Sequence, residues 1–185
     1  MFQQALATIL ARLDTARTRG LVQGYALIGG FAVSAWGMPR ATQDVDFAVA
    51  IGNTDPQALA AFLGGRYETG GPDDPLQGFM HASIDVDSIA VPLQLVFFAP
   101  RFTEVIFRHV ERLSVMGQFV PVVSWQILVL LKLYAGGPQD QLDAGQILKV
   151  RQPQPDALRQ MAELAESLDL LEEWTTFLKR HPISA

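Results

Sequence analysis

The chain has 185 residues, no cysteine and a formal net charge of −5 at pH 7, and 49% of its residues are hydrophobic. This length fits one domain, or a compact core with a helical appendage. The absence of cysteine excludes disulfides and thiolate-bound zinc. The negative charge argues against a protein that grips nucleic acid over its whole surface, since phosphate binding needs clustered Lys and Arg.

Targeting and membrane-spanning segments are not evident in the sequence. Apolar residues between positions 2 and 13 recur at helical spacing among polar ones, which predicts an amphipathic helix rather than a signal peptide. The most apolar run, 119–131, contains Pro121, Ser124 and Gln126 and is shorter than the ~20 residues that a membrane crossing needs. We therefore expect a cytoplasmic protein with no membrane partner.

A glycine pair interrupts the first apolar segment. The run 25–28 predicts a short strand that stops at Gly29 and Gly30, where the missing Cβ atoms permit a tight turn and the close approach of a ligand. A helix is predicted over 31–36 and ends at Gly37. The pattern is therefore strand, turn and helix.

Two aspartates mark the next predicted strand, 44–51. The residues alternate in character at its start, so Asp44 and Asp46 are expected on one face and the intervening apolar residues on the other. Two like charges on one face repel each other unless a cation or a base compensates them. A metal ion is the simplest explanation, although the pair could also cap a sheet edge.

The rest of the chain predicts further strands followed by helices. A helix is predicted at 56–63, a loop at 70–75, and strands at 78–86 and 89–98. A helix carrying residues 102–110 follows, then strands at 114–116 and 118–122, and finally helices from 124, 139, 155 and 170 onward. The fold class expected is α/β of the α+β type, with a mixed or largely antiparallel sheet flanked by helices. We expect a core at 1–123 and a helical region at 124–185, with a soft boundary.

The block 27–47 combines a phosphate-binding turn with a metal-binding strand. Backbone N–H groups at a glycine turn before a helix can hold a triphosphate, helped by the helix dipole. Mg²⁺ prefers one or two protein carboxylates, with phosphate oxygens and waters completing its octahedron. Gly29, Gly30, Asp44 and Asp46 therefore predict a site for Mg²⁺ and a nucleoside triphosphate.

These residues resemble the signature of the DNA polymerase β-like nucleotidyltransferase superfamily, in which a Gly-Gly or Gly-Ser turn precedes an Asp-x-Asp strand. The spacing Arg40-x-Thr42-x-Asp44-x-Asp46 is similar to the AbiEii-like and minimal nucleotidyltransferase group. Two later segments, Lys132-Leu-Tyr-Ala135 and Asp140-Gln-Leu-Asp143, resemble the Lys-x-x-Ala and Asp-x-x-Asp helical motifs of the same group. Two ordered matches are more specific than either alone.

The resemblance implies a nucleotidyltransferase fold and a role for each matched residue. Gly29 and Gly30 would bind phosphates, Asp44 and Asp46 would bind one or two Mg²⁺ ions, and Lys132 would contact a phosphate or the leaving pyrophosphate.

Four further matched residues are expected to support this site. Arg40 and Thr42 would assist the nucleotide or the acidic strand. Asp140 and Asp143 lie one helical turn apart, so they would share a face and position Lys132 or an acceptor.

One position departs from the resemblance. A third carboxylate is expected on a neighbouring strand, and the corresponding segment, 91–97, carries Gln94 instead. A neutral amide can orient a water or a hydroxyl, but it cannot ligate the metal as an anion or deprotonate an acceptor efficiently. Asp85 and Asp87 on the preceding strand are the candidate substitutes. Gln139 likewise stands where the group carries a basic residue.

Purely structural explanations compete for several of these residues. A lone glycine pair is more often only a turn. Lys132 could extend its amine from an apolar helix to water, and Asp140 in a first helical turn is stabilised by the helix dipole in any case. The three histidines are interpreted as solvated or packed, and the tryptophans as core or interface anchors.

The sequence thus predicts an enzyme that transfers an NMP from Mg-NTP to an acceptor hydroxyl and releases pyrophosphate. The resemblance allows tRNA, protein or a small molecule such as an aminoglycoside as acceptor, and implies a toxin paired with an antitoxin protein. The alternative is a nucleotide-binding or protein-interaction module that keeps the fold without catalysis, motivated by Gln94. A purely structural partner protein is a third hypothesis.

Overall fold

The computed structural model describes residues 2–71 and 74–182, so part of the predicted loop 70–75 lies outside the described residues. The elements are, in chain order, α1 (Phe2–Thr18), β1 (Gly24–Ile28), α2 (Gly29–Ala35), β2 (Val45–Ala50), α3 (Pro56–Leu63), β3 (Arg66–Thr69), β4 (Leu76–Val86), β5 (Ile89–Phe98), α4 (Pro100–Arg108), β6 (Val110–Val115), β7 (Gln118–Val123), α5 (Trp125–Ala135), α6 (Pro138–Arg151), α7 (Pro155–Ser167) and α8 (Leu171–Arg180). Each helix within the described ranges is too short or too polar to cross a bilayer.

One seven-stranded sheet organises the chain, with strand order β3-β4-β5-β2-β1-β7-β6. Strand β2 runs parallel to β5, and β1 runs parallel to β7, whereas the remaining neighbours are antiparallel. The expectation of an α/β protein with a mixed sheet flanked by helices is therefore confirmed. The central position of β1 and β2 places the end of β1 and the start of β2 beside each other.

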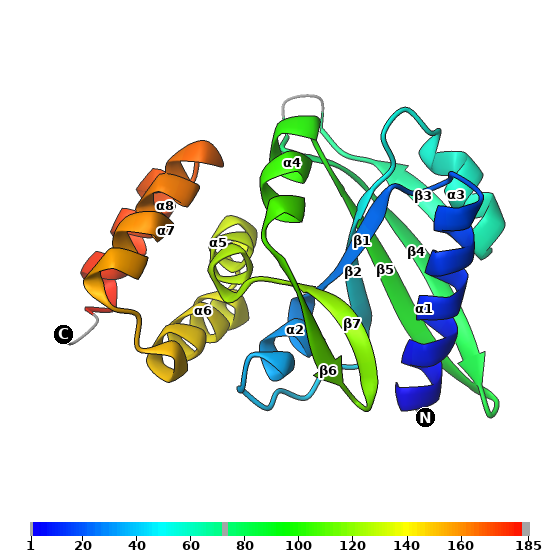
Figure 1. Ribbon diagram of the computed structural model, residues 1–185, viewed down its shortest axis with the longest axis horizontal. Helices are drawn as coiled ribbons and strands as arrows, with labels where there is room; N and C mark the ends of the chain where they lie inside the picture. The colour runs from blue at the N-terminus through cyan, green and yellow to red at the C-terminus, as the bar shows by residue number, and fades with distance from the viewer. Residues whose placement is uncertain (1, 72–73, 183–185) are drawn as a thin grey trace.

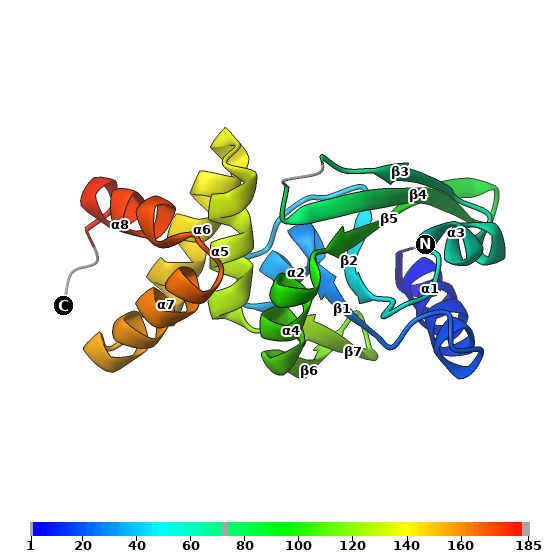
Figure 2. The same ribbon diagram turned by 90° about the horizontal axis from the view of Figure 1, so that it is seen from above.

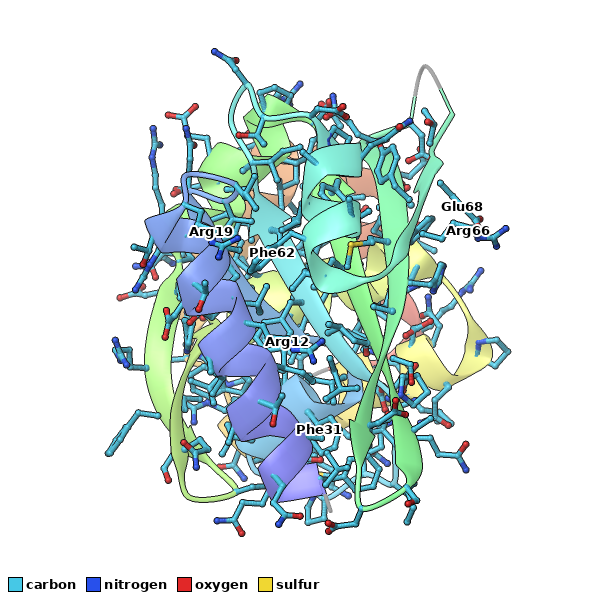
Figure 3. The ribbon with its side chains drawn as sticks, turned by 90° about the vertical axis from the view of Figure 1, so that its right-hand side faces the viewer. Arg12, Arg19, Phe31, Phe62, Arg66 and Glu68 are labelled. Atoms are coloured by element: carbon cyan, nitrogen blue, oxygen red, sulfur yellow. The ribbon has the colours of Figure 1, made fainter. Side chains whose placement is uncertain are left out.

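Helices cover the two sides of this sheet unequally. Helix α1 crosses one face, contacting β4 and β7, and α3 lies beside it (Figures 1 and 3). Helix α2 packs on β1 and β2 and also contacts α5, while α5 to α8 form a helical group at the other end of the molecule (Figures 1 and 2). The arrangement leaves the functional candidates on the side of the sheet that faces α5 and α6.

The apolar periodicities correspond to one buried core that extends through both parts of the chain. The tryptophans anchor it: Trp174 is 1% exposed, and the indole N–H of Trp36 donates to the backbone oxygen of Val123 at 2.9 Å. Strand β7 ends at Val123 and α5 follows, so the sheet ends where the helical region begins. A division into two domains at that point remains a prediction.

Local capping signals in the sequence are reproduced at two helix starts. The carboxylate of Asp55 accepts from the backbone N–H of Gln57 at 2.9 Å, and the hydroxyl of Ser124 accepts from that of Ile127 at 3.4 Å. Side-chain acceptors at these positions satisfy N–H groups that have no partner inside the helix.

Three sequence predictions require correction. Strand β3 was not predicted, because it is short, largely exposed and lacks an apolar alternation. Helix α4 ends at Arg108, and Val110 belongs to β6, where it pairs with Val123 rather than continuing the helical stripe. Asp44 lies immediately before β2 rather than within it.

Candidate active site

The glycine turn between β1 and α2 packs directly against the acidic strand. Gly29 has a φ of +65°, and a Cβ atom there would lie 1.9 Å from Oδ2 of Asp46. A Cβ atom on Gly30 would lie 2.8 Å from the Cβ atom of Thr42 and would also meet Nη1 of Arg40. Both positions therefore require glycine, one for its backbone conformation and its contact and the other for its contact alone.

Asp46 is a buried carboxylate at the base of the site, with only 9% of its surface exposed. Burial, and then the neighbouring charge of Asp44, raise the pKa of Asp46 to about 6, although Lys132, Arg40 and the backbone N–H of Gly30 act in the opposite direction. The charged form is thus incompletely compensated by the protein itself. A bound cation would supply the missing compensation.

Asp44 is the exposed member of the pair. The hydroxyl of Thr42 donates to Oδ1 of Asp44 at 2.6 Å, which fixes the carboxylate just before β2 begins. The two aspartates therefore combine one buried and one solvent-facing carboxylate. Such a pair can ligate an ion that keeps waters and phosphate oxygens in its remaining positions.

Lys132 of α5 lies buried between two aspartates of α6. Its Nζ atom is 2.7 Å from Oδ1 of Asp140 and 3.0 Å from Oδ2 of Asp143. Asp143 is completely buried, and its Oδ2 atom is also 3.5 Å from Nε of Arg40. The amide of Gln139 donates to the other carboxylate oxygen, Oδ1, at 3.0 Å. The network holds the ammonium group of Lys132 in one place.

The sequence left open whether Asp140 and Asp143 position Lys132 or an acceptor, and their contacts favour Lys132. Both carboxylates meet Lys132, so they position this lysine. Lys132 itself is only 8% exposed, which differs from a lysine that extends its amine into water. Its charge also lowers the pKa of Asp46, which places it within electrostatic reach of the acidic pair.

A cavity of about 360 Å³ collects most of the predicted residues. The predicted residues that line it are Gly29, Gly30, Arg40, Asp44, Asp46, Gln94, Lys132 and Asp140. Thr42 and Asp143 do not line the cavity, but they bind residues that do.

Two aromatic side chains, one from β4 and one from α5, complete the cavity wall. Phe79 and Tyr134 are lining residues to which the sequence assigned no role. The hydroxyl of Tyr134 donates to Asp74, which joins α5 to the segment before β4. The sequence signal for Tyr134 was its place inside the Lys132 motif, whereas Phe79 could be found only from strand register.

Gln94 occupies the strand position directly opposite Asp46 in the parallel pair of β2 and β5. It lines the same cavity, so the departure identified in the sequence lies at the site itself. Asp85 pairs with Ala90 far along the β4–β5 hairpin, and Asp87 lies in its turn with a φ of +50°. Neither lines the cavity, so neither takes the place of a third carboxylate.

The donor set fits Mg²⁺ held by two carboxylates. Within residues 2–71 and 74–182, no group of three His, Asp or Glu side chains converges as a metal cluster. Asp44 and Asp46 are nevertheless sufficient, because Mg²⁺ commonly takes one or two carboxylates and completes its shell with waters and substrate phosphates. The raised pKa of Asp46 supports this fit, because its charge is incompletely compensated by the protein.

A comparison with solved structures found similar chains, although no family model and no curated protein sequence matches this chain. An antigenic nucleotidyltransferase-like protein from Paracoccidioides brasiliensis is 19% identical, with 98% of this chain and 95% of that chain covered and a TM-score of 0.53. ANT(2″)-Ia in complex with adenylyl-2″-tobramycin is 16% identical, with 94% and 97% covered and a TM-score of 0.46. A candidate nucleotidyltransferase from Thermotoga maritima is 12% identical, with 73% and 84% covered and a TM-score of 0.48.

The similarity to the Paracoccidioides protein extends over nearly the whole of both chains. Together with the mixed sheet and its flanking helices, it shows that this chain has the nucleotidyltransferase fold. Asp46 and Gln94 lie on central strands of that fold, and the glycine turn and Asp44 directly adjoin β1 and β2.

Proposed function

We infer that the protein is a magnesium-dependent nucleotidyltransferase that transfers an NMP from an NTP to an acceptor hydroxyl and releases pyrophosphate. The observation that carries this proposal is the contact between the glycine turn and the buried, incompletely compensated carboxylate of Asp46. A phosphate-binding turn and a cation-binding carboxylate are thereby joined in one cavity.

The net negative charge around the cavity favours the binding of a cation over that of a free anion. Two cationic side chains, Arg40 and Lys132, meet four aspartates: Asp44, Asp46, Asp140 and Asp143. The surplus is negative, so a free triphosphate would be repelled and a magnesium complex would be accepted. Asp44 and Asp46 would hold the ion, which neutralises phosphate charge and polarises the phosphoryl group under attack.

The remaining residues of the site would bind and orient the nucleotide. The turn at Gly29 and Gly30 would lie beside the phosphates, where the backbone N–H of Gly30 holds the carboxylate of Asp46 that would ligate the cation. Lys132, fixed by Asp140 and Asp143, would stabilise the charge that develops on the leaving pyrophosphate. Arg40 would support the same turn from its other side.

A label-transfer experiment tests this proposal. The protein is incubated with Mg²⁺, each α-labelled NTP and separate pools of tRNA, protein and aminoglycosides, with Asp46→Asn as the matched variant. Transfer to one pool that is lost in the variant supports the enzyme and identifies its acceptor class. Tight Mg-NTP binding without transfer to any pool would support a binding module instead.

We also infer a narrower assignment within the nucleotidyltransferases. The Arg40-to-Asp46 spacing and the paired contacts of Lys132 favour the AbiEii-like group and, with it, a cytoplasmic toxin held in check by an antitoxin protein. Growth arrest on expression, relieved by Asp46→Asn, is the expected result. Equal growth with either form would contradict the toxin role.

A further inference from the structure

A row of cross-strand partners leads away from the candidate active site across the sheet. Asp46 on β2 pairs with Gln94 on β5, and Gln94 pairs with His81 on β4. Directly paired residues on neighbouring strands point to the same face. Because adjacent strands are about 4.8 Å apart, the Cα atoms of Asp46 and His81 are separated by roughly 10 Å, with Gln94 between them.

This face of β3, β4 and β5 is open beyond the cavity. His81 and Ser83 are exposed, and helices α1 and α3 lie on the opposite face of these strands (Figure 2). Arg66 and Glu68 project from β3 on the side away from α1 and α3 (Figure 3). An acceptor molecule can therefore reach the row without displacing any described helix.

His81 does not line the cavity, but two of its neighbours do. It stacks on Phe79 with ring centroids 6.2 Å apart and an interplanar angle of 25°, and Phe79 is itself a lining residue. Gln94, the strand partner of His81, lines the cavity as well. Two neighbours of His81 thus belong to the site, one on its own strand and one on the next.

The proposed reaction needs a proton acceptor that the cavity does not otherwise provide. The attacking hydroxyl must lose its proton, and the amide of Gln94 cannot take it. Asp44 and Asp46 would be engaged with the cation, and the carboxylate of Asp140 accepts from the ammonium group of Lys132. The next side chain of the row with a basic nitrogen is the imidazole of His81.

We propose that His81 is the general base that deprotonates the acceptor hydroxyl, an inference that rests on the proposed function. The hydroxyl proton passes to an unprotonated imidazole nitrogen of His81, directly or through one water. The oxygen electron pair forms the new bond to the α-phosphorus. The bond from the α-phosphorus to the bridging oxygen breaks, and its electron pair leaves with pyrophosphate.

The charged side chains beside His81 on the neighbouring strand β3 are those of Arg66 and Glu68. Arg66 is the strand partner of His81 on β3, and Arg66 forms an ion pair with Glu68 of the same strand. Gln94 on the other side is neutral, and Phe79 contributes only a ring. An acceptor bound over β4 and β5 would therefore lie between His81 and the metal-binding pair, with Arg66 at its outer end.

The test compares His81→Gln and His81→Ala with Ser83→Ala, an exposed residue two positions along the same face of β4. His81→Gln is expected to lower the transfer rate by about 10²-fold or more while Mg-NTP affinity stays unchanged. Ser83→Ala should leave both unchanged. Added imidazole should restore transfer by His81→Ala, since the vacated position is open to solvent.

A second readout is independent of turnover. The sequence contains three histidines, so comparison with His81→Ala assigns the imidazole signal of His81 in an NMR spectrum. This signal should shift when acceptor is added to the protein with Mg²⁺ and a non-transferable NTP analogue. Those of His109 and His181 should not.

Three results would overturn the inference. Transfer by His81→Gln within about threefold of the wild type would exclude a general base, because such a base contributes far more. Lost transfer in His81→Ala without imidazole rescue, or together with lost Mg-NTP binding, would show a structural role. Absence of transfer by the wild-type protein would contradict the proposed function itself. This result is obtained before any variant is measured, so it is distinguished from a failure of the His81 inference alone.

Discussion

Gly29 and Asp46 occupy adjoining space so tightly that a Cβ atom on the glycine would lie 1.9 Å from the carboxylate oxygen. The backbone N–H of the next residue, Gly30, donates to the same carboxylate. The turn after β1 and the start of β2 therefore form one unit. A change in either partner should alter both the fold and the binding of a magnesium nucleotide.

Gly29→Ala should destabilise the protein and abolish Mg-NTP binding. The substitution combines a left-handed backbone with the clash against Asp46, and the backbone strain alone costs about 1–2 kcal/mol. We expect a total loss of at least about 3 kcal/mol in the free energy of unfolding. Urea unfolding and nucleotide titration measure the two effects.

Gly20→Ala is the matched control, since Gly20 has a φ of +75° and nothing lies within 4 Å of an added Cβ atom. Gly20→Ala should lower the free energy of unfolding only by the cost of the backbone strain, and it should bind Mg-NTP normally. Equal effects of the two substitutions would contradict the contact between Gly29 and Asp46.

Asp46 should make the metal-free protein less stable as the pH rises. Because its pKa is raised to about 6 in the fold, the folded protein holds this proton more tightly than the unfolded chain does. The associated stability is fully present below about pH 4 and is lost as the pH rises through 6, by an amount on the order of 3 kcal/mol. Urea unfolding between pH 4 and pH 8 measures this slope.

Asp46→Asn should remove that slope and be more stable than the wild type at pH 8 without metal. Mg²⁺ should stabilise the wild type at pH 8 and leave the variant unchanged. Asp85→Asn, an exposed carboxylate outside the cavity, serves as the control and should follow the wild type. Identical pH profiles for wild type and Asp46→Asn would contradict this account of the buried carboxylate.

Lys132→Met should leave Asp143 buried without its closest cation. Removing one partner of a buried ion pair costs about 3–5 kcal/mol, and Asp143 is completely buried. The exposed lysine of α6, Lys149, provides the control variant Lys149→Met, which should change the free energy of unfolding by less than about 0.5 kcal/mol.

The double variant Lys132→Met with Asp143→Asn distinguishes a lost ion pair from lost packing. It should recover part of the stability, because no uncompensated charge remains buried. Additive losses would show that the two residues do not interact.

Gln94→Asp should strengthen magnesium binding by restoring a carboxylate opposite Asp46. A third anionic ligand is expected to tighten Mg²⁺ roughly tenfold and to lower stability in the absence of metal. Gln94→Ala should do neither. Calorimetric Mg²⁺ titration gives the comparison, and unchanged affinity in Gln94→Asp would place this side chain outside the ion's reach.

The strongest sequence patterns were local, and they predicted local structure well. Helices α3 and α5, capped by Asp55 and Ser124, begin within one residue of the predicted positions, and β4 and β5 lie where two strands were predicted. In each case, neighbouring residues determine the hydrogen bonds. The mixed character of the sheet was likewise expected from the order of strands and helices.

What the sequence could not provide was register between distant strands. The opposition of Asp46 and Gln94, and then of Gln94 and His81, depends on the pairing of β2 with β5 and of β5 with β4. His81 was interpreted as solvated or packed, because no local pattern connects it with residues more than thirty positions away. Strand β3 was missed for a related reason, since only its pairing with β4 makes it a strand.

The measurement that tests the central claim most directly is transfer of α-labelled NMP by the wild-type protein and by Asp46→Asn, with Mg²⁺ and with EDTA. We predict transfer by the wild type with Mg²⁺, none with EDTA, and a decrease on the order of a hundredfold or more in the variant. Transfer that persists at the wild-type rate in Asp46→Asn, or no transfer from any NTP to tRNA, protein or aminoglycoside pools, would contradict the assignment of this cavity as a nucleotidyltransferase active site.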